Sequence, residues 1–204
     1  MTEEPHEMPE VDLGEVGQLG DIDPALATAV LELEAHAAEA GWDQPARLYA
    51  LVDTAELLAA EPALADLMGL DAATAAGTLT PVEQEPLAGE LEEQLQAIAW
   101  PADVAGCAAV VERLVLPPDA DAAIPDDPAA AAAFARQHPD RQEVRIVAGA
   151  TRAGATYCAL RLRAHDDAAS VVGGADVVPA LLDLLRATLE LQEETAEQTE
   201  EETE

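Results

Sequence analysis

The chain has 204 residues, with 42 acidic side chains against nine basic ones, all arginine, so its net charge at pH 7 is −33. A field of this sign repels nucleic-acid backbones and anionic membrane surfaces over roughly 8–10 Å, so we expect neither as a partner. Half of the residues are apolar but many are alanine, so the core must depend on leucine and valine.

The two ends differ from the middle in charge. Residues 1–22 hold seven acids and no arginine, and residues 192–204 hold seven glutamates and no basic residue. We therefore predict disordered acidic tails at 1–22 and 192–204, around a single domain over 23–191. The start lacks the basic and apolar parts of a secretory signal, and no apolar run approaches 18 residues. These features favour a cytoplasmic protein.

The first half of the domain begins with Asp23 as an N-cap before Pro24, followed by apolar residues at helical spacing up to Gly41. We then predict, in order, a strand at 47–52, a short helix capped by Asp53, a helix from Pro62 to Gly69, a loop at 70–80, a helical turn from Thr80 and a helix over 87–98.

For the second half we predict a strand over 104–116, a loop over 117–128, an alanine-rich helix capped by Asp127, strands over 142–149 and 155–165, a break at Gly173 and Gly174, and a last helix capped by Asp176. The fold class is therefore α+β: a single domain with about four mostly antiparallel strands, packed with N- and C-terminal helices.

Six of the nine arginines lie between Arg136 and Arg163, a stretch of 28 residues that contains only two acids. This stretch covers the predicted hairpin of 142–149 and 155–165. In both strands the even-numbered residues are apolar and belong to the core. Even-numbered residues must therefore lie opposite even-numbered ones, so the residue numbers of each opposed pair must have an even sum. A sum of 304 suits the loop and predicts three opposed pairs: Glu143 with Arg161, Arg145 with Ala159, and Arg141 with Arg163.

The other face of this hairpin is the candidate binding site. Its members are Arg141, Arg145, Tyr157, Arg161, Arg163 and His165. Like charges directly opposed need a neutralising partner. That partner is either internal, from Asp140, Asp166, Asp167 or the tails, or external, from a bound anion or a protein. Both alternatives stay open.

Catalytic and metal-binding patterns are missing from the sequence. The histidines have no metal-ligand spacing, the glycines at 149 and 154 join two strands and form no phosphate loop, and Ser170 has no nucleophile elbow. We expect no metal and no cofactor. Cys107 and Cys158 lie among apolar residues, and we expect them to be buried, reduced thiols.

Several stretches together resemble an uncharacterised family of small acidic actinobacterial proteins. They are residues 41–48, 79–85, 98–101, 112–117, 138–145 and 161–163. The resemblance covers roughly residues 24–190 and excludes both tails. It implies a cytoplasmic α+β domain of unknown role, and it supplies no catalytic residues.

We therefore carry several functional hypotheses. The first is a non-catalytic binding, adaptor or chaperone-like module with a protein partner, for which a homodimer is left open. The alternative is an enzyme or binding protein for an anionic small molecule, which would use the arginine-lined face with His165 as the acid–base group. A third is nucleic-acid mimicry, ranked last because much of the acid excess lies in the tails.

Overall fold

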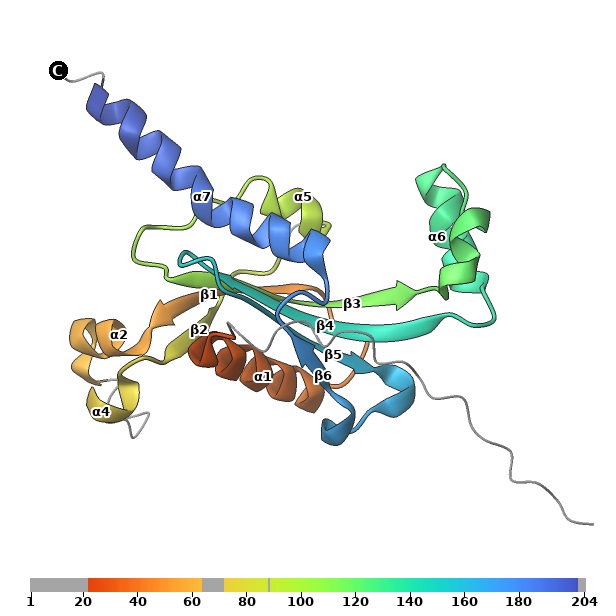
Figure 1. The fold of residues 1–204 in the computed structure, drawn as a ribbon, viewed down its shortest axis with the longest axis horizontal. Coiled ribbons are helices and arrows are strands. Elements are labelled where there is room, and N and C mark those ends of the chain that lie inside the picture. The colour runs from red at the N-terminus through yellow and green to blue at the C-terminus, as the bar shows by residue number, and fades with distance from the viewer. Residues whose placement is uncertain (1–21, 64–71, 88, 202–204) are drawn as a thin grey trace, which may run out of the picture.

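The computed structural model describes residues 22–63, 72–87 and 89–201. It is an α+β domain in which a sheet of six antiparallel strands lies between helices on its two faces (Figure 1). The strand order is β2-β1-β3-β4-β5-β6. The strands are β1 (Arg47–Asp53), β2 (Leu79–Glu83), β3 (Gly106–Val115), β4 (Gln142–Thr151), β5 (Thr156–Leu162) and β6 (Val172–Gly174). The predicted fold class is confirmed.

The helices lie on both faces and at the ends of the sheet. They are α1 (Pro24–Glu39), α2 (Thr54–Ala60), α4 (Ala72–Ala75), α5 (Leu91–Leu95), α6 (Pro128–Gln137) and α7 (Pro179–Glu201), with 3₁₀ turns η1 (Pro118–Ala123), η2 (Arg163–His165) and η3 (Ala168–Ser170). As predicted, Asp23, Asp53 and Asp127 accept backbone N–H groups at the starts of α1, α2 and α6. The last helix begins at Pro179, later than the predicted cap at Asp176.

Strand alternation divides the core between two layers. One face of the sheet packs against α5 and α7 through residues that include Cys107, Ile146 and Leu185. The other face packs against α1, where Val30 and Val147 belong to one buried cluster. Both faces are therefore covered by helices, and the arginine-bearing face is the one beneath α1.

The β4–β5 hairpin has an even index sum, as predicted, but the sum is 306 and not 304. The three predicted pairs are therefore wrong, and Arg145 lies directly opposite Arg161. The reason is Gly154, which has a φ of 87° and closes a three-residue loop in which its N–H donates to Thr151 O at 2.9 Å. A glycine in this left-handed conformation belongs at the last loop position, which moves the centre of the turn by one residue.

The predicted helical turn from Thr80 is wrong, because residues 79–83 form edge strand β2 against β1. The N–H of Gln84 donates to the carbonyl of Leu48 in β1, and the carbonyl of Thr78 accepts from the N–H of Thr54, which directly follows β1. By strand alternation Pro81, which has no N–H, faces the open edge, where a missing donor costs nothing. The same proline discourages another chain from adding to the sheet there.

Other boundaries also differ from the predictions. The apolar stripe over 87–98 forms only the short helix α5, and the strand predicted over 155–165 ends at Leu162. Gly173 and Gly174, predicted to break the chain, belong to edge strand β6, and an added Cβ on Gly173 would lie 2.3 Å from Tyr157 Oη. Two short edge strands, β2 and β6, thus extend the four that were predicted.

The ends of the chain are only partly described. The predicted tail at 1–22 lies outside the described residues apart from Ile22, as does most of the helix predicted from Pro62 to Gly69. Helix α7 continues to Glu201, through most of the segment predicted as the second tail. Within the described ranges, no helix combines the length and apolarity that a membrane crossing requires.

Candidate functional site

The site is built on a row of three charged side chains across the sheet. In the β3–β4 register Glu112 lies opposite Arg145, and in the β4–β5 register Arg145 lies opposite Arg161. Arg145 Nη2 is 3.3 Å from Glu112 Oε1. Two guanidinium groups directly opposed on one face need negative charge close by, and Glu112 can serve only the first of them.

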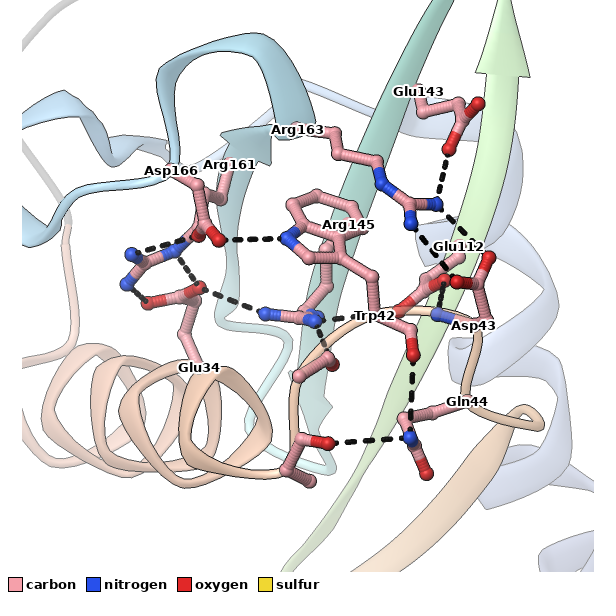
Figure 2. Close-up of polar contacts among 12 residues, drawn as sticks. Glu34, Trp42, Asp43, Gln44, Glu112, Glu143, Arg145, Arg161, Arg163 and Asp166 are labelled. Carbon is pink, nitrogen blue, oxygen red and sulfur yellow. Dashed lines mark hydrogen bonds and ion pairs between the residues drawn. The ribbon is translucent and has the colours of Figure 1, made fainter.

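The second neutralising carboxylate comes from the helix above. Glu34 of α1 accepts two hydrogen bonds from Arg161, at 2.6 and 2.7 Å, in a fork-to-fork geometry (Figure 2). Its Oε1 also lies 4.0 Å from Arg145 Nη1. The side chains of Glu34, Arg145 and Arg161 are 3%, 1% and 6% exposed. Helix α1 therefore covers the arginine face and neutralises it, and the Glu34 carboxylate raises the pKa of Arg161.

Residues 41–46, which we call the strap, connect α1 to β1 beside this buried cluster. Gly41 ends the helix in the left-handed region at φ 82°, and its carbonyl accepts a hydrogen bond from Arg145 Nη2. Two residues later Asp43 is also left-handed, at φ 65°. Its N–H donates to Glu112 Oε2 at 2.8 Å. The backbone of the strap is thus held by two of the three residues in the sheet row, Arg145 and Glu112.

Trp42 is the centre of the strap. Its ring centroid lies 4.4 Å from the guanidinium carbon of Arg145 and 5.6 Å from that of Arg163. The indole N–H donates to Asp166 Oδ2 at 2.9 Å, while Asp166 Oδ1 lies 3.4 Å from Arg161 Nη1 (Figure 2). Trp42 therefore joins the buried arginine pair to the chain after η2.

Arg163 of η2 ties the strap from the outside. It donates from two nitrogens to the two carboxylate oxygens of Asp43, each at 2.9 Å, and from Nη1 to Glu143 Oε2 at 2.6 Å. The hydrogen bond from Arg163 holds the pKa of Asp43 below its ordinary value. These side chains are 40%, 75% and 38% exposed for Arg163, Asp43 and Glu143. The outer ties therefore lie in water, whereas the inner cluster does not.

We call this whole group the arginine site. Its members are Glu34, Trp42, Asp43, Glu112, Glu143, Arg145, Arg161, Arg163 and Asp166. Five carboxylates surround three guanidinium groups, so the site carries a small negative excess and already supplies the anions that its arginines need. Among the described residues, Arg145 Nη1 is the buried side-chain nitrogen or oxygen that lacks a hydrogen-bond partner. Such an atom is a cost that the surrounding structure must offset.

The structure brings together only part of the predicted site. Arg145, Arg161 and Arg163 belong to the arginine site, although Arg163 lies in η2 and not on the strand. Tyr157 is half-buried on the same sheet face. The other two residues are exposed: Arg141 bonds to the His138 carbonyl in the turn before β4, and His165 is in η2. Binding by these six residues stays a prediction.

Sequence reasoning missed Glu34, Trp42, Asp43 and Glu112 as members of the site. Glu34 interrupts the apolar stripe of α1, four residues after Val30, and this was the signal available for it. The contacts of the strap could not be inferred, because they depend on where a helix-to-strand connection lies above strands that are far away in the sequence.

The remaining nucleophile candidates are buried elsewhere. Cys107 and Cys158 are fully buried free thiols, as predicted. Burial raises the pKa of Cys107 to about 11 and also raises the pKa of Cys158. In the part of the chain that the structure describes, no group of three or more His, Cys, Asp or Glu residues could hold a metal ion.

The comparisons with known proteins concern the folded domain. The model of a protein family described as PPA1309-like protein matches residues 26–190, most of the chain. Searches with this chain found no matching curated protein and no matching solved structure. The matched range includes every residue of the arginine site.

Proposed function

This chain belongs to the PPA1309-like protein family, and we propose that it is a non-catalytic binding module that recognises a cationic segment of a partner protein. The recognising element in this proposal is the arm, residues 118–137, which comprises η1 and α6. The arm stands away from the sheet at the far end of β3 and β4 (Figure 1). The cytoplasmic location stays a prediction.

The observation that carries the proposal is that none of the ten residues of α6 is buried. This helix is rich in alanine and contains Phe134, yet it covers neither face of the sheet. Most helices of a globular protein are stabilised by packing an apolar face. In α6 only Ala131, Ala133, Phe134 and Ala135 are even half-buried, so most of its surface is available to another protein.

The base of the arm adds exposed apolar side chains and a groove. Leu114 and Val115 of β3 are 37% and 46% exposed, and Ile124 of the arm is 39% exposed. A groove of about 460 Å³ runs between the arm and β3. Its lining has apolar, acidic and basic side chains: Leu114, Ala132 and Ala135, then Glu90, Glu92 and Glu112, and then Arg113 and Arg136. An apolar surface with a charged rim is the composition of a protein-binding site.

The net charge of −33 selects the kind of partner. A second copy of this chain would carry the same charge and be repelled, whereas a segment that bears lysine or arginine beside apolar side chains would be attracted. The proposal therefore commits to a cationic partner, and self-association is a competing outcome.

The test is site-specific photo-crosslinking of the full chain in cells. A photoreactive phenylalanine analogue replaces Ile124, and the matched control replaces Val172 of β6, which is 62% exposed but lies away from the arm. We expect a discrete adduct with a basic protein from position 124 only, lost when Leu114→Asp is added. A crosslink from position 124 to a second copy of this chain or to an acidic protein would overturn the proposal, and so would the absence of any crosslink from this position.

The alternative, an enzyme or binding protein for an anionic small molecule, is tested by the melting temperature. A panel of nucleotides, phosphorylated metabolites and dicarboxylates is added to the wild type and to Arg163→Gln. Because Arg163 is already paired with Asp43 and Glu143, we expect no compound to raise the melting temperature. A rise that is lost in Arg163→Gln would favour the alternative.

A further inference from the structure

We propose that the strap is a salt-sensitive latch: it closes over the buried Glu34–Arg145–Arg161 cluster, and the outer ion pairs of Arg163 set how often it opens. The inference concerns the arginine site and does not depend on the arm or its partner. It rests on three features, namely the contrast between inner and outer ties, the backbone of the strap, and the unpartnered nitrogen of Arg145.

The buried ion pairs of Glu34 and the exposed ion pairs of Arg163 should respond differently to salt. The pairs of Glu34 with Arg145 and Arg161 join side chains that are at most 6% exposed. The pairs of Arg163 with Asp43 and Glu143 join side chains that are at least 38% exposed, and Asp166, which accepts from Trp42, is 47% exposed. Salt screens exposed pairs strongly and buried pairs much less. Salt therefore loosens the strap while the cluster beneath it persists.

The backbone of the strap contains two turning points. Gly41 and Asp43 have φ of 82° and 65° on either side of Trp42. Among the described residues, Asp43 is the one non-glycine residue with positive φ. This conformation is disfavoured for a residue with a Cβ, although aspartate tolerates it better than most. The Arg163 fork and the bond from the Asp43 N–H to Glu112 both hold Asp43 in this conformation, so losing the fork removes one of its two restraints.

Opening the strap changes the surroundings of Arg145 most. Its Nη1 has no hydrogen-bond partner and its side chain is 1% exposed, while Trp42 lies over its guanidinium (Figure 2). Moving the indole of Trp42 away gives water, or an anion from the buffer, access to Arg145 Nη1. The gain in solvation offsets part of the lost cation–π contact, so the open state is accessible without unfolding.

Trp42 reports on the latch directly. The chain has two tryptophans, and Trp100 is 4% exposed and bonded to Thr188. In a Trp100→Phe background, acrylamide quenching of fluorescence measures the exposure of Trp42 alone. If this background folds poorly, the same quantity is obtained in the wild-type background by subtracting the quenching of Trp42→Phe.

The experiment compares Arg163→Gln with Arg186→Gln at about 20 mM and about 0.5 M NaCl. Arg186 is a matched control because it forms an exposed ion pair with Asp183 on α7, away from the strap. We expect salt to raise the quenching constant of the parent and of Arg186→Gln. Arg163→Gln should be about two- to fivefold more quenched at low salt, the change expected for losing an exposed ion pair.

The latch also predicts that the fold survives this change. Far-UV circular dichroism of Arg163→Gln should match that of the parent at both salt concentrations. If the quenching constant of Arg163→Gln equals that of the parent and is independent of salt, the strap is static and the proposal is overturned. A rise in quenching accompanied by loss of the helical signal would also overturn it, because Trp42 would then be exposed by unfolding.

Discussion

Glu34 is the residue on which the arginine site depends most. Its carboxylate accepts two short hydrogen bonds from Arg161, and its Oε1 also lies 4.0 Å from the unpartnered Nη1 of Arg145. A buried ion pair adds little net stability compared with apolar packing, but removing one partner leaves an uncompensated charge in the interior. Here Glu34 is the most buried of the carboxylates that face the two guanidinium groups, and Glu112 and Asp166 are their more exposed partners.

Replacing Glu34 with glutamine should therefore destabilise the protein strongly. Glutamine keeps the size of the side chain but removes the charge, and it cannot accept from both arms of the Arg161 fork. We expect the free energy of unfolding in urea to fall by about 3–5 kcal/mol. Glu32→Gln, on the exposed side of the same helix, should change it by less than about 0.5 kcal/mol. Equal effects of the two substitutions would contradict the role of Glu34.

The two cysteines should be unreactive in the native protein. Both are fully buried, and burial raises the pKa of Cys107 to about 11. A raised thiol pKa means that almost no thiolate is present at pH 8, and the thiolate is the reactive form. An aromatic disulfide reagent should therefore label neither thiol at pH 8 and both after unfolding in urea. Rapid labelling of the folded protein would show that the interior opens more readily than the structure indicates.

Among the elements, α1 packs tightly against the sheet at Gly149. An added Cβ on Gly149 of β4 would lie 2.9 Å from Val30 Cγ2 and 3.0 Å from Leu26 Cδ1. Glycine at this position lets the helix come close enough for Glu34 to reach Arg161. The site therefore depends on a residue that makes no polar contact with it.

Gly149→Ala should push α1 away from the sheet. The extra methyl group meets two buried side chains, so the helix or its side chains must shift, at a cost of about 1–3 kcal/mol in the free energy of unfolding. Gly89→Ala is the control, because its added Cβ would meet nothing closer than 3.8 Å. Urea denaturation of both variants measures the difference. An unchanged midpoint for Gly149→Ala would mean that α1 is packed more loosely than described.

At the same scale, sequence patterns predicted some elements better than others. α1 was predictable because its N-cap, its apolar stripe and its final glycine agree. β3 was predictable because the run of valine and leucine over 110–116 favours a strand. β2 was not, because Thr80-Pro81-Val82-Glu83 matches a helix start, and only pairing with β1 makes it a strand. The hairpin parity followed from the alternation of apolar residues, but the exact register depended on the conformation of Gly154.

At the scale of the whole molecule, the site contrasts with the charge around it. The sequence shows where the arginines lie, but it could not show that α1 covers two of them, because the packing of a helix on a sheet face joins residues more than a hundred positions apart. Only five of the 42 acidic side chains lie in the arginine site, so most of the acidic residues lie elsewhere in the chain. Their mutual repulsion opposes the compact state.

Salt should therefore stabilise the molecule as a whole. Raising NaCl from about 20 mM to about 0.5 M shortens the range of repulsion well below the size of the domain. Each 1 kcal/mol gained should raise the melting temperature by about 2–4 °C for a chain of this length. Calorimetry or circular dichroism measures the shift, and potassium or tetramethylammonium chloride at equal ionic strength should act alike, because screening does not depend on the cation. A fall in melting temperature with salt would mean that ion pairs such as those of Arg163 contribute more to stability than the acidic excess costs.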